Sequence, residues 1–300
     1  MTEPMRPTRR TLGALAAGLG LAAPAGAAAS TGGAPRFRLG APDTLAERWA
    51  RLEPHVTVYG PDDDQPRPAV MLFHGCGGQR SLARHYAEAA AAIGWRAFTV
   101  DSFAARGWNR PFALTFVCTG MLLKGSERAG DVLATCWGVA QRPDVDPDRL
   151  VIAGWSHGSW SAMDLMTMPL TRPGEAGLAD PSPEPLKGLR GLFLAYPYGG
   201  IGALSRVRDW VRKTKVAAIL CEKDHITSPK DAERLYGAAR RAGCEVDLWR
   251  VGASHAFDEE DCGPPMKYDP ELSAQSHARF QRFLEATVKP EELAPEALSA

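Results

Sequence analysis

Short apolar runs separated by helical patterns extend along the chain from residue 55 nearly to its C-terminus. The run 69–75 (AVMLFHG) is continuously apolar and ends in glycine, as expected for a strand that is buried on both faces. The run 55–59 (HVTVY) alternates in character, which predicts a strand with two different faces. We expect further strands at 95–103, 149–154, 191–197, 215–224 and 244–251.

Helical patterns lie between these runs. The segment 81–94 ends in a glycine that suits a helix C-terminus, and the segment 126–141 begins with a serine cap and has Glu127 in its first turn. Further helices are expected at 158–168, 202–213, 230–242 and 271–288. This alternation predicts an α/β fold, a mostly parallel twisted sheet with helices on both faces.

Two stretches, 104–124 and the Pro-rich 169–187, lack a clear pattern. Long loops in compact domains often have functional roles, so we expect these two above a binding site. No break in composition marks a second domain. The chain is therefore expected to hold a linker at 30–50, one folded domain at 51–290 and a C-terminal tail at 291–300.

The first 29 residues differ from the rest. Arg6, Arg9 and Arg10 precede a weakly apolar Ala/Gly/Leu stretch, which ends in small residues that suit signal peptidase. The sequence TRRTLG (8–13) is similar to a twin-arginine export signal. We expect residues 1–29 to be a signal peptide and the mature protein to be exported to the periplasm. A disordered Ala-rich tail is the alternative.

Composition narrows the classes of partner. The chain is 45% hydrophobic and 23% charged, as in ordinary soluble proteins, and its formal net charge is zero. Nothing in this balance favours nucleic acid or an anionic membrane as a partner. Beyond the N-terminus no apolar run reaches about 18 residues, so we expect no membrane span in the mature chain.

The chain has six cysteines: Cys76, Cys118, Cys136, Cys221, Cys244 and Cys262. In an oxidising compartment some could pair. We expect Cys118 and Cys136 first, since both lie near one predicted loop–helix junction; free buried thiols are the alternative. Long spacings without a C-x-x-C motif argue against a zinc cluster, so no metal is expected.

The segment VIAGWSHGSW (151–160) sets Ser156 between Gly154 and Gly158, at a predicted junction of strand and helix. This G-x-S-x-G pattern is typical of a nucleophile elbow, in which a strained backbone presents the serine hydroxyl at the carboxyl end of the sheet. Side chains at the two glycine positions would collide with the adjoining elements. Ser156 is therefore the candidate nucleophile, and a Gly-rich turn with a capping serine is the alternative.

A serine hydroxyl is a weak nucleophile until a base takes its proton. Sheet enzymes with this elbow supply the acid and then the histidine later in the chain. Asp224 ends the predicted strand 215–224 and is the candidate orienting acid, with Glu222 as the alternative. His255 lies in a loop of small residues after the next strand and is the candidate general base.

A tetrahedral intermediate also needs hydrogen-bond donors for its negative charge. The backbone N–H of His157, directly after the serine, is one candidate, and we expect it to matter more than the His157 ring. The glycine-rich loop 73–80 (FHGCGGQR) offers the other through the main chain of Cys76. Candidate pocket-lining residues near these segments are Arg106, Trp108, Arg110 and Trp155.

Several ordered motifs resemble those of the α/β-hydrolase superfamily and, within it, the dienelactone hydrolase family. They are FHGCGG, the helix with Arg128 and Asp131, GWSHGS, EKD with Asp224, and SHAF with His255. The resemblance covers roughly residues 50–290 and implies an α/β-hydrolase catalytic domain.

Two positions depart from the dienelactone hydrolase pattern. Ser156 stands where that family uses a cysteine, and Gly75 stands where it carries a glutamate. The resemblance therefore implies a serine-dependent variant that cleaves a small-molecule ester or lactone without a cofactor. The alternatives are a peptidase or amide hydrolase on the same fold, a catalytically silent relative that binds a ligand, and a thiol-dependent activity of Cys76.

Overall fold

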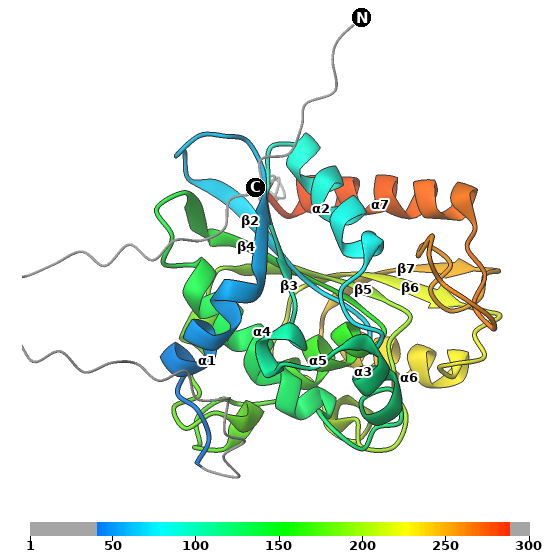
Figure 1. Ribbon diagram of the computed structural model, residues 1–300, viewed down its shortest axis with the longest axis horizontal. Helices are drawn as coiled ribbons and strands as arrows, with labels where there is room; N and C mark the ends of the chain where they lie inside the picture. Colours follow the sequence, from blue (N-terminus) through cyan, green and yellow to red (C-terminus); the bar gives the residue numbers. More distant parts are fainter. Residues whose placement is uncertain (1–40, 289–300) are drawn as a thin grey trace, which may run out of the picture.

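A seven-stranded sheet lies between two layers of helices (Figure 1). The computed structural model describes residues 41–288. The strands are β1 (Val56–Tyr59), β2 (Arg67–Phe73), β3 (Arg96–Val100), β4 (Val145–Trp155), β5 (Leu189–Ala195), β6 (Lys215–Cys221) and β7 (Glu245–Val251). Each of them overlaps a strand that the apolar runs predict.

The strand order is β1-β3-β2-β4-β5-β6-β7, and only β1 runs antiparallel to its neighbour. The register aligns the carboxyl ends of adjacent parallel strands: Phe73 pairs with Gly154, and Cys221 pairs with Val251. The loops that follow β2, β4, β6 and β7 therefore begin at one edge of the sheet. The mostly parallel sheet that the alternating pattern predicts is confirmed.

Helices cover both faces of this sheet (Figure 1). On one face lie α2 (Ser81–Ala92) and α7 (Pro270–Val288); on the other lie α1 (Leu45–Leu52), α4 (Gly125–Val139), α5 (His157–Met166) and α6 (Pro229–Arg241). The short α3 (Arg110–Phe116) belongs to the long connection between β3 and α4. Within the described residues, no helix has the length and apolar character needed to cross a membrane.

Alternate residues of the central strands supply two hydrophobic cores. Met71 and Phe73 of β2 belong to the cluster shared with α4 and α5, whereas Val70 and Leu72 belong to the cluster shared with α2 and α7. All four side chains are at most 1% exposed. Burial of both faces explains why the β2 sequence is continuously apolar.

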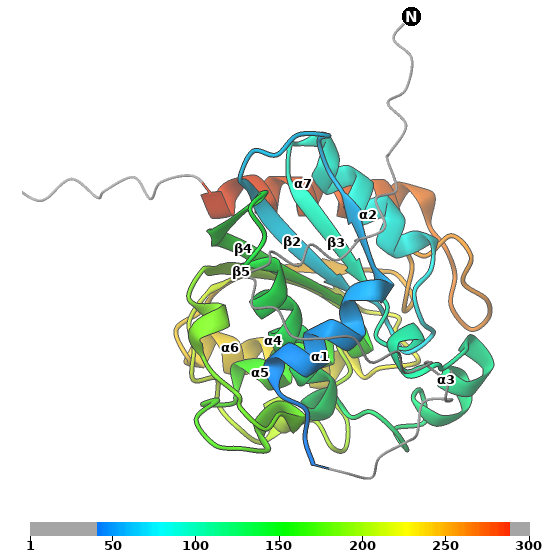
Figure 2. The same cartoon turned by 60° about the vertical axis from the view of Figure 1, so that its left-hand side comes forward.

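Helix α1 is an element that the apolar pattern did not predict. Thr44 caps it, and Thr44 and Glu47 bond to each other's backbone in a capping box. Leu45, Trp49 and Leu52 are buried, and α1 lies against α4 (Figure 2). The packed part of the chain therefore begins at residue 45, within the segment 30–50 expected as a linker.

The prediction of a helix at 202–213 is wrong. Only one short turn, Leu204–Arg206, forms there. Gly202 has a φ of +91°, the Trp210 side chain is buried in the core, and the Val211 N–H donates to the Met166 carbonyl. These tertiary contacts hold the segment in an irregular path of turns and bends, although its local composition suits a helix.

The two patternless stretches differ in the structure. Residues 104–124 contain the short turn Ala104–Arg106 and α3, which Asn109 caps and which has Pro111 in its first turn, whereas 169–187 holds only the short turns Glu175–Gly177 and Glu184–Leu186. The expected signal peptide at 1–29 and the expected tail at 291–300 lie outside the described residues.

Candidate active site

Ser156 occupies a sharp bend between β4 and α5. Its φ of +51° lies in the left-handed region that non-glycine residues rarely adopt. A Cβ atom at Gly154 would lie 2.6 Å from the backbone of Gly158, and one at Gly158 would lie 2.0 Å from the Phe73 carbonyl oxygen. The bend therefore requires both glycines, as the elbow pattern predicts.

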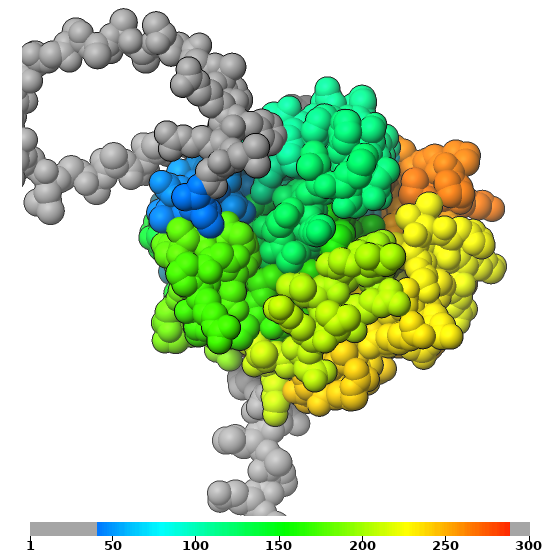
Figure 3. All heavy atoms as spheres, turned by 90° about the horizontal axis from the view of Figure 1, so that it is seen from below, coloured from blue at the N-terminus to red at the C-terminus, as the bar shows by residue number. Residues whose placement is uncertain are grey.

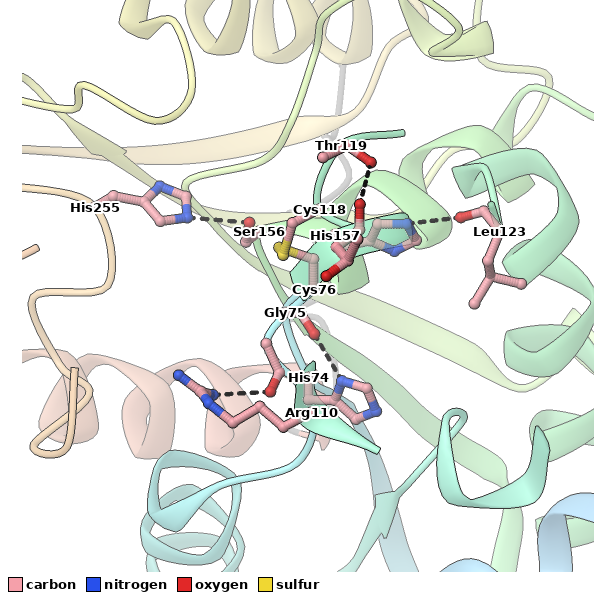
Figure 4. The surroundings of a disulfide bond; sticks show 12 residues. His74, Gly75, Cys76, Arg110, Cys118, Thr119, Leu123, Ser156, His157 and His255 are labelled. Carbon is pink, nitrogen blue, oxygen red and sulfur yellow. Dashed lines mark hydrogen bonds between the residues drawn. A yellow bond between two sulfur atoms is a disulfide. The ribbon is translucent and has the colours of Figure 1, made fainter. Parts of the chain in front are cut away.

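The structure brings Ser156, His255 and Asp224 together at the carboxyl edge of the sheet. The Ser156 Oγ lies 3.0 Å from His255 Nε2 (Figure 4), and His255 Nδ1 lies 2.7 Å from Asp224 Oδ2. The three residues are 8%, 5% and 8% exposed, so little water competes for these bonds. With the Nδ1 proton donated to the carboxylate, the Nε2 lone pair is free to accept the serine proton.

Asp224 is fixed as a hydrogen-bond acceptor on both oxygens. Its Oδ1 accepts from the N–H groups of Ile226 and Thr227, and its Oδ2 accepts from the Thr227 hydroxyl as well as from His255. Burial alone would raise the pKa of Asp224, but these hydrogen bonds and the electrostatic interaction with the His255 imidazole lower it below its usual value. The carboxylate therefore stays ionised. The alternative acid, Glu222, is exposed.

A buried polar cluster anchors the loop that carries His255. Asp258, three residues later, accepts hydrogen bonds from the Tyr86 hydroxyl at 2.6 Å and the Tyr196 hydroxyl at 2.7 Å. The Tyr196 ring also contacts the His255 ring, with 4.7 Å between centroids. Tyrosines from α2 and from the end of β5 thus hold the imidazole in place. No local sequence motif marks this cluster.

The candidate oxyanion loop follows β2 and lies against the serine. A Cβ atom at Gly75 would lie 3.4 Å from the Ser156 Cβ. Cys76 takes no part in the backbone hydrogen bonds described for this loop, and His157 is the first residue of α5, where an N–H has no intrahelical acceptor. Both candidate donors therefore remain available to a ligand.

Cys76 also forms a disulfide with Cys118, the second residue after α3 (Figure 4). The expected Cys118–Cys136 pair is wrong, because Cys136 is a free, buried thiol in the core. Cys136 lies 11 residues beyond the first residue of α4, which displaces it by about 17 Å along the helix axis at ~1.5 Å per residue. The junction at which α4 begins is thus far from this cysteine.

The His157 ring has partners of its own, which sequence reasoning did not anticipate. Its Nε2 lies 2.8 Å from the Leu123 carbonyl oxygen, and its Nδ1 lies 3.2 Å from Arg128 Nη1. Burial and the charge of Arg128 lower the pKa of His157 to about 3, so the ring is neutral. Arg128 entered the sequence analysis only as part of a family resemblance.

The expected pocket-lining residues have different positions. Trp155 is 1% exposed and packs on Tyr86, so it belongs to the core and not to a pocket. Arg106 forms two hydrogen bonds to Asp131, and its guanidinium lies over the Trp108 ring. Arg110 is exposed and donates to the Gly77 carbonyl of the oxyanion loop. Of the four, Arg110 has the direct contact with the site.

Two surface segments flank the start of α5. Leu123 contacts His157 from one side, and the Tyr198 ring lies 4.7 Å from the Trp160 ring on the other. Figure 3 shows both segments, around α3 and around residues 197–212, on the face seen from below. Among residues 41–288, no three side chains of the metal-binding types come together as a site.

Comparison with known proteins identifies the fold. No protein-family model and no curated protein sequence matches the chain. A solved dienelactone hydrolase-like promiscuous phosphotriesterase from metagenomic libraries matches with a TM-score of 0.60 and 15% identity, over 77% of this chain and 92% of that one.

Two structures of Thermogutta terrifontis esterase 2 are also similar. The butyrate-bound form has a TM-score of 0.55 and 18% identity, over 80% of this chain and 91% of that one. The form phosphorylated by paraoxon has a TM-score of 0.54 and 19% identity, over 77% and 88%. These likenesses show that the chain has the α/β-hydrolase fold, as the resemblance of its motifs implied.

Proposed function

We propose that this protein is a serine hydrolase that cleaves a carboxylic ester or lactone through an acyl-enzyme on Ser156. The observation that carries the proposal is the continuous chain Ser156 Oγ–His255 Nε2 at 3.0 Å and His255 Nδ1–Asp224 Oδ2 at 2.7 Å. The serine at the end of this hydrogen-bonded series is held in the strained backbone of the elbow. A nucleophile, a base and an orienting acid in these positions are the parts of acyl transfer.

In the acylation step, the Ser156 oxygen attacks the substrate carbonyl while its proton passes to His255 Nε2. The carbonyl oxygen becomes an oxyanion, which the N–H groups of Cys76 and His157 stabilise. Each such donor contributes a factor of about 10²–10³ in kcat. Asp224 stabilises the imidazolium, because its carboxylate faces Nδ1.

The intermediate then collapses, and the bond between the carbonyl carbon and the alkoxy oxygen breaks. His255 gives its proton to the departing alcohol, which leaves an ester of Ser156. Water repeats the sequence with His255 again as base, and releases the acid and the free serine. For a lactone, the alcohol and the acid remain one molecule.

The similar solved structures support this choice of chemistry. Esterase 2 of Thermogutta terrifontis has been solved with butyrate bound and in forms phosphorylated by paraoxon or phosphonylated by sarin. We propose that short acyl esters enter the site of this chain, and that organophosphates modify Ser156. Gly75 leaves the space beside Ser156 open where dienelactone hydrolases carry a glutamate, which favours another substrate than a dienelactone.

The test is labelling with a fluorophosphonate probe. Purified protein should acquire one label, on a peptide that contains Ser156, and Ser156→Ala should acquire none. Ser159→Ala is the matched control, because Ser159 is a buried serine of α5 whose hydroxyl donates to the Gly154 carbonyl. An unmodified protein that stays unlabelled would favour a catalytically silent, ligand-binding relative.

A substrate series then separates ester from amide hydrolysis. p-Nitrophenyl esters from acetate to decanoate and the matching anilides would be compared at equal concentration. We expect turnover of the esters with a preference for short acyl chains. Faster turnover of the anilides would favour the peptidase alternative.

We further propose export to the periplasm. The twin-arginine pattern at residues 8–13 supports it, and so does the Cys76–Cys118 disulfide, since such bonds persist in oxidising compartments. In a bacterial host the full chain should be recovered from the periplasm, and Arg9→Lys with Arg10→Lys should retain it in the cytoplasm. Equal periplasmic recovery of the two forms would contradict this route.

A further inference from the structure

Arg128 connects the two segments that carry the candidate oxyanion donors. It lies in the first turns of α4, and its side chain is fully buried. Its Nη1 donates to the His74 carbonyl oxygen at 2.7 Å and to His157 Nδ1 at 3.2 Å, while its Nε donates to the Ser102 hydroxyl at 3.1 Å. One nitrogen thus bonds to the loop after β2 and to the residue after the nucleophile.

The contact with Arg128 fixes the tautomer of His157. A guanidinium can only donate, so the Nδ1 of His157 must be the acceptor and carry no proton. The ring proton therefore lies on Nε2, where it is donated to the Leu123 carbonyl at 2.8 Å. The imidazole is held between a donor on one side and an acceptor on the other. This arrangement also restrains the backbone of His157, whose N–H is a candidate oxyanion donor.

Arg128 also restrains the second candidate donor, the Cys76 N–H, through its bond to the His74 carbonyl. His74 is two residues before Cys76, and its carbonyl belongs to the peptide unit directly before Gly75. On the opposite side, Gly158 touches the end of β2 so closely that a Cβ atom would lie 2.0 Å from the Phe73 oxygen. The two segments are therefore in direct contact at Phe73 and bridged at His74, which sets their separation.

Arg128 can donate these hydrogen bonds at every pH at which its guanidinium is protonated. Burial lowers its pKa to about 10, and the charge of Asp131 opposes that shift, so the guanidinium is protonated at neutral pH. Asp131 is itself buried and bonded to Arg48 at 2.9 Å and to Arg106 at 2.7 Å. The charge of Asp131 thus helps to keep Arg128 a permanent donor behind the site.

We propose that Arg128 is a positioning residue that sets the distance between the Cys76 and His157 N–H groups, and that oxyanion stabilisation depends on it. The inference rests on the proposed function. Arg128 touches no substrate in this role, and it acts through the two loops that it bridges. Its contribution should therefore appear in the transition state and leave ground-state binding unchanged.

The test compares Arg128→Met, Arg128→Lys and Arg48→Met. Met fills much of the space without donors, Lys keeps the charge but lacks the planar fork, and Arg48→Met disturbs the same Asp131 from the side of α1. With p-nitrophenyl butyrate, we expect R128M to lose about 100-fold in kcat with KM within about threefold. R128K should recover part of this loss, and R48M should keep the kcat of the unmodified protein.

A tetrahedral inhibitor gives a second measurement. An alkyl trifluoromethyl ketone adds to the serine and places its oxyanion in the hole, whereas the matching methyl ketone reports ground-state binding. R128M should weaken the fluorinated ketone by the same factor as kcat and leave the methyl ketone unchanged. Equal effects of R128M and R48M, or an R128K enzyme equal to the unmodified one, would overturn the inference.

If R128M does not fold, an NMR measurement on the unmodified protein tests the contact between Arg128 and His157. In ¹⁵N-histidine NMR of the unmodified protein at pH 7.5, the His157 signals, assigned by their loss in His157→Gln, should report an unprotonated Nδ1 and a protonated Nε2. The opposite tautomer would contradict the bridge. Failure of fluorophosphonate labelling would remove the proposed function alone, because the tautomer does not depend on it.

Discussion

Cys76 and Cys118 are joined by a disulfide, so the loop that carries a candidate oxyanion donor is covalently tied to the segment after α3. Their Cα atoms are 5.1 Å apart, and 42 positions separate them in the sequence. The same segment continues to Leu123, whose carbonyl accepts from His157. Both sides of the proposed oxyanion hole therefore contact one stretch of chain.

Loss of this disulfide should lower both stability and activity. A cross-link across a loop of this length reduces the entropy of the unfolded chain, so Cys118→Ser should cost up to about 4 kcal/mol in the free energy of unfolding. Because the Cys76 loop loses its tie, kcat should fall by about tenfold or more. Urea unfolding and ester turnover measure the two effects. Cys262→Ser, which removes a free thiol, should change neither, and full activity of C118S would contradict the prediction.

Asp224 and Glu222 should differ sharply in their effect on catalysis. Asp224→Asn keeps the size of the side chain but loses the charge opposite His255 Nδ1, so kcat should fall by about 10⁴. Glu222→Gln removes a charge from an exposed neighbour on the same loop and should stay within twofold of the unmodified protein. Initial rates with a p-nitrophenyl ester measure both variants. Comparable losses in the two would place the orienting acid elsewhere.

The two glycine positions Gly158 and Gly252 provide a matched pair for the stability of the elbow. Gly158→Ala would force a Cβ atom to 2.0 Å from the Phe73 carbonyl oxygen, whereas a Cβ at Gly252 meets nothing within 4 Å. We expect Gly158→Ala to cost about 3 kcal/mol or more in the free energy of unfolding and Gly252→Ala less than about 0.5 kcal/mol. Chemical denaturation of both would show this difference, and equal stabilities would contradict the close approach of α5 to β2.

Stability should fall as the pH falls below neutrality, in part because of His277. Burial and the neighbouring His85 lower the pKa of His277 from 6.5 to about 4. Between pH 6.5 and 4 the unfolded chain therefore binds a proton that the folded chain does not, and the free energy of unfolding decreases as the pH decreases through this window. For the partly exposed His277 the loss from pH 7.5 to 5 should be about 1 kcal/mol.

His277→Gln removes this titration, so its free energy of unfolding should decrease less between pH 7.5 and 5 than that of the unmodified protein. The comparison of pH differences cancels the loss of the His277–Tyr86 ring contact, which affects both conditions equally. His55→Gln, at an exposed histidine of another segment, is the control for general effects of removing a histidine. The same pH dependence in H277Q and the unmodified protein would contradict the assignment.

The sequence predicts the fold and the candidate triad through local signals. Ser156 is marked by its flanking glycines, and Asp224 and His255 by their places after successive strands. The pairing of Cys118 could not be predicted in the same way. Cys136 is near the start of α4 in the sequence, but its position along the helix axis places it far from that end. The helix expected at 202–213 is wrong because Trp210 and Val211 gain tertiary contacts that a local pattern does not contain.

Other features needed partners that are distant in the sequence. The His157 ring has a defined role only beside Arg128, which precedes it by 29 positions and comes from another helix. Asp258 likewise depends on Tyr86 and Tyr196, from α2 and the end of β5. Helix α1 could have been predicted from the sequence, since Thr44 and Glu47 have the spacing of a capping box.

The bonds at the start of the described chain set a limit on truncation. Arg48 donates to Asp43 and to Asp131, and the Leu45 N–H donates to Asp180, so the earliest described residues are bonded to α4 and to the segment 169–187. A protease that trimmed the protein to residue 53 would remove one of the two arginines bonded to Asp131. A shortened version for crystallisation should therefore retain everything from residue 41 onward, and maturation near residue 29 would leave these bonds intact.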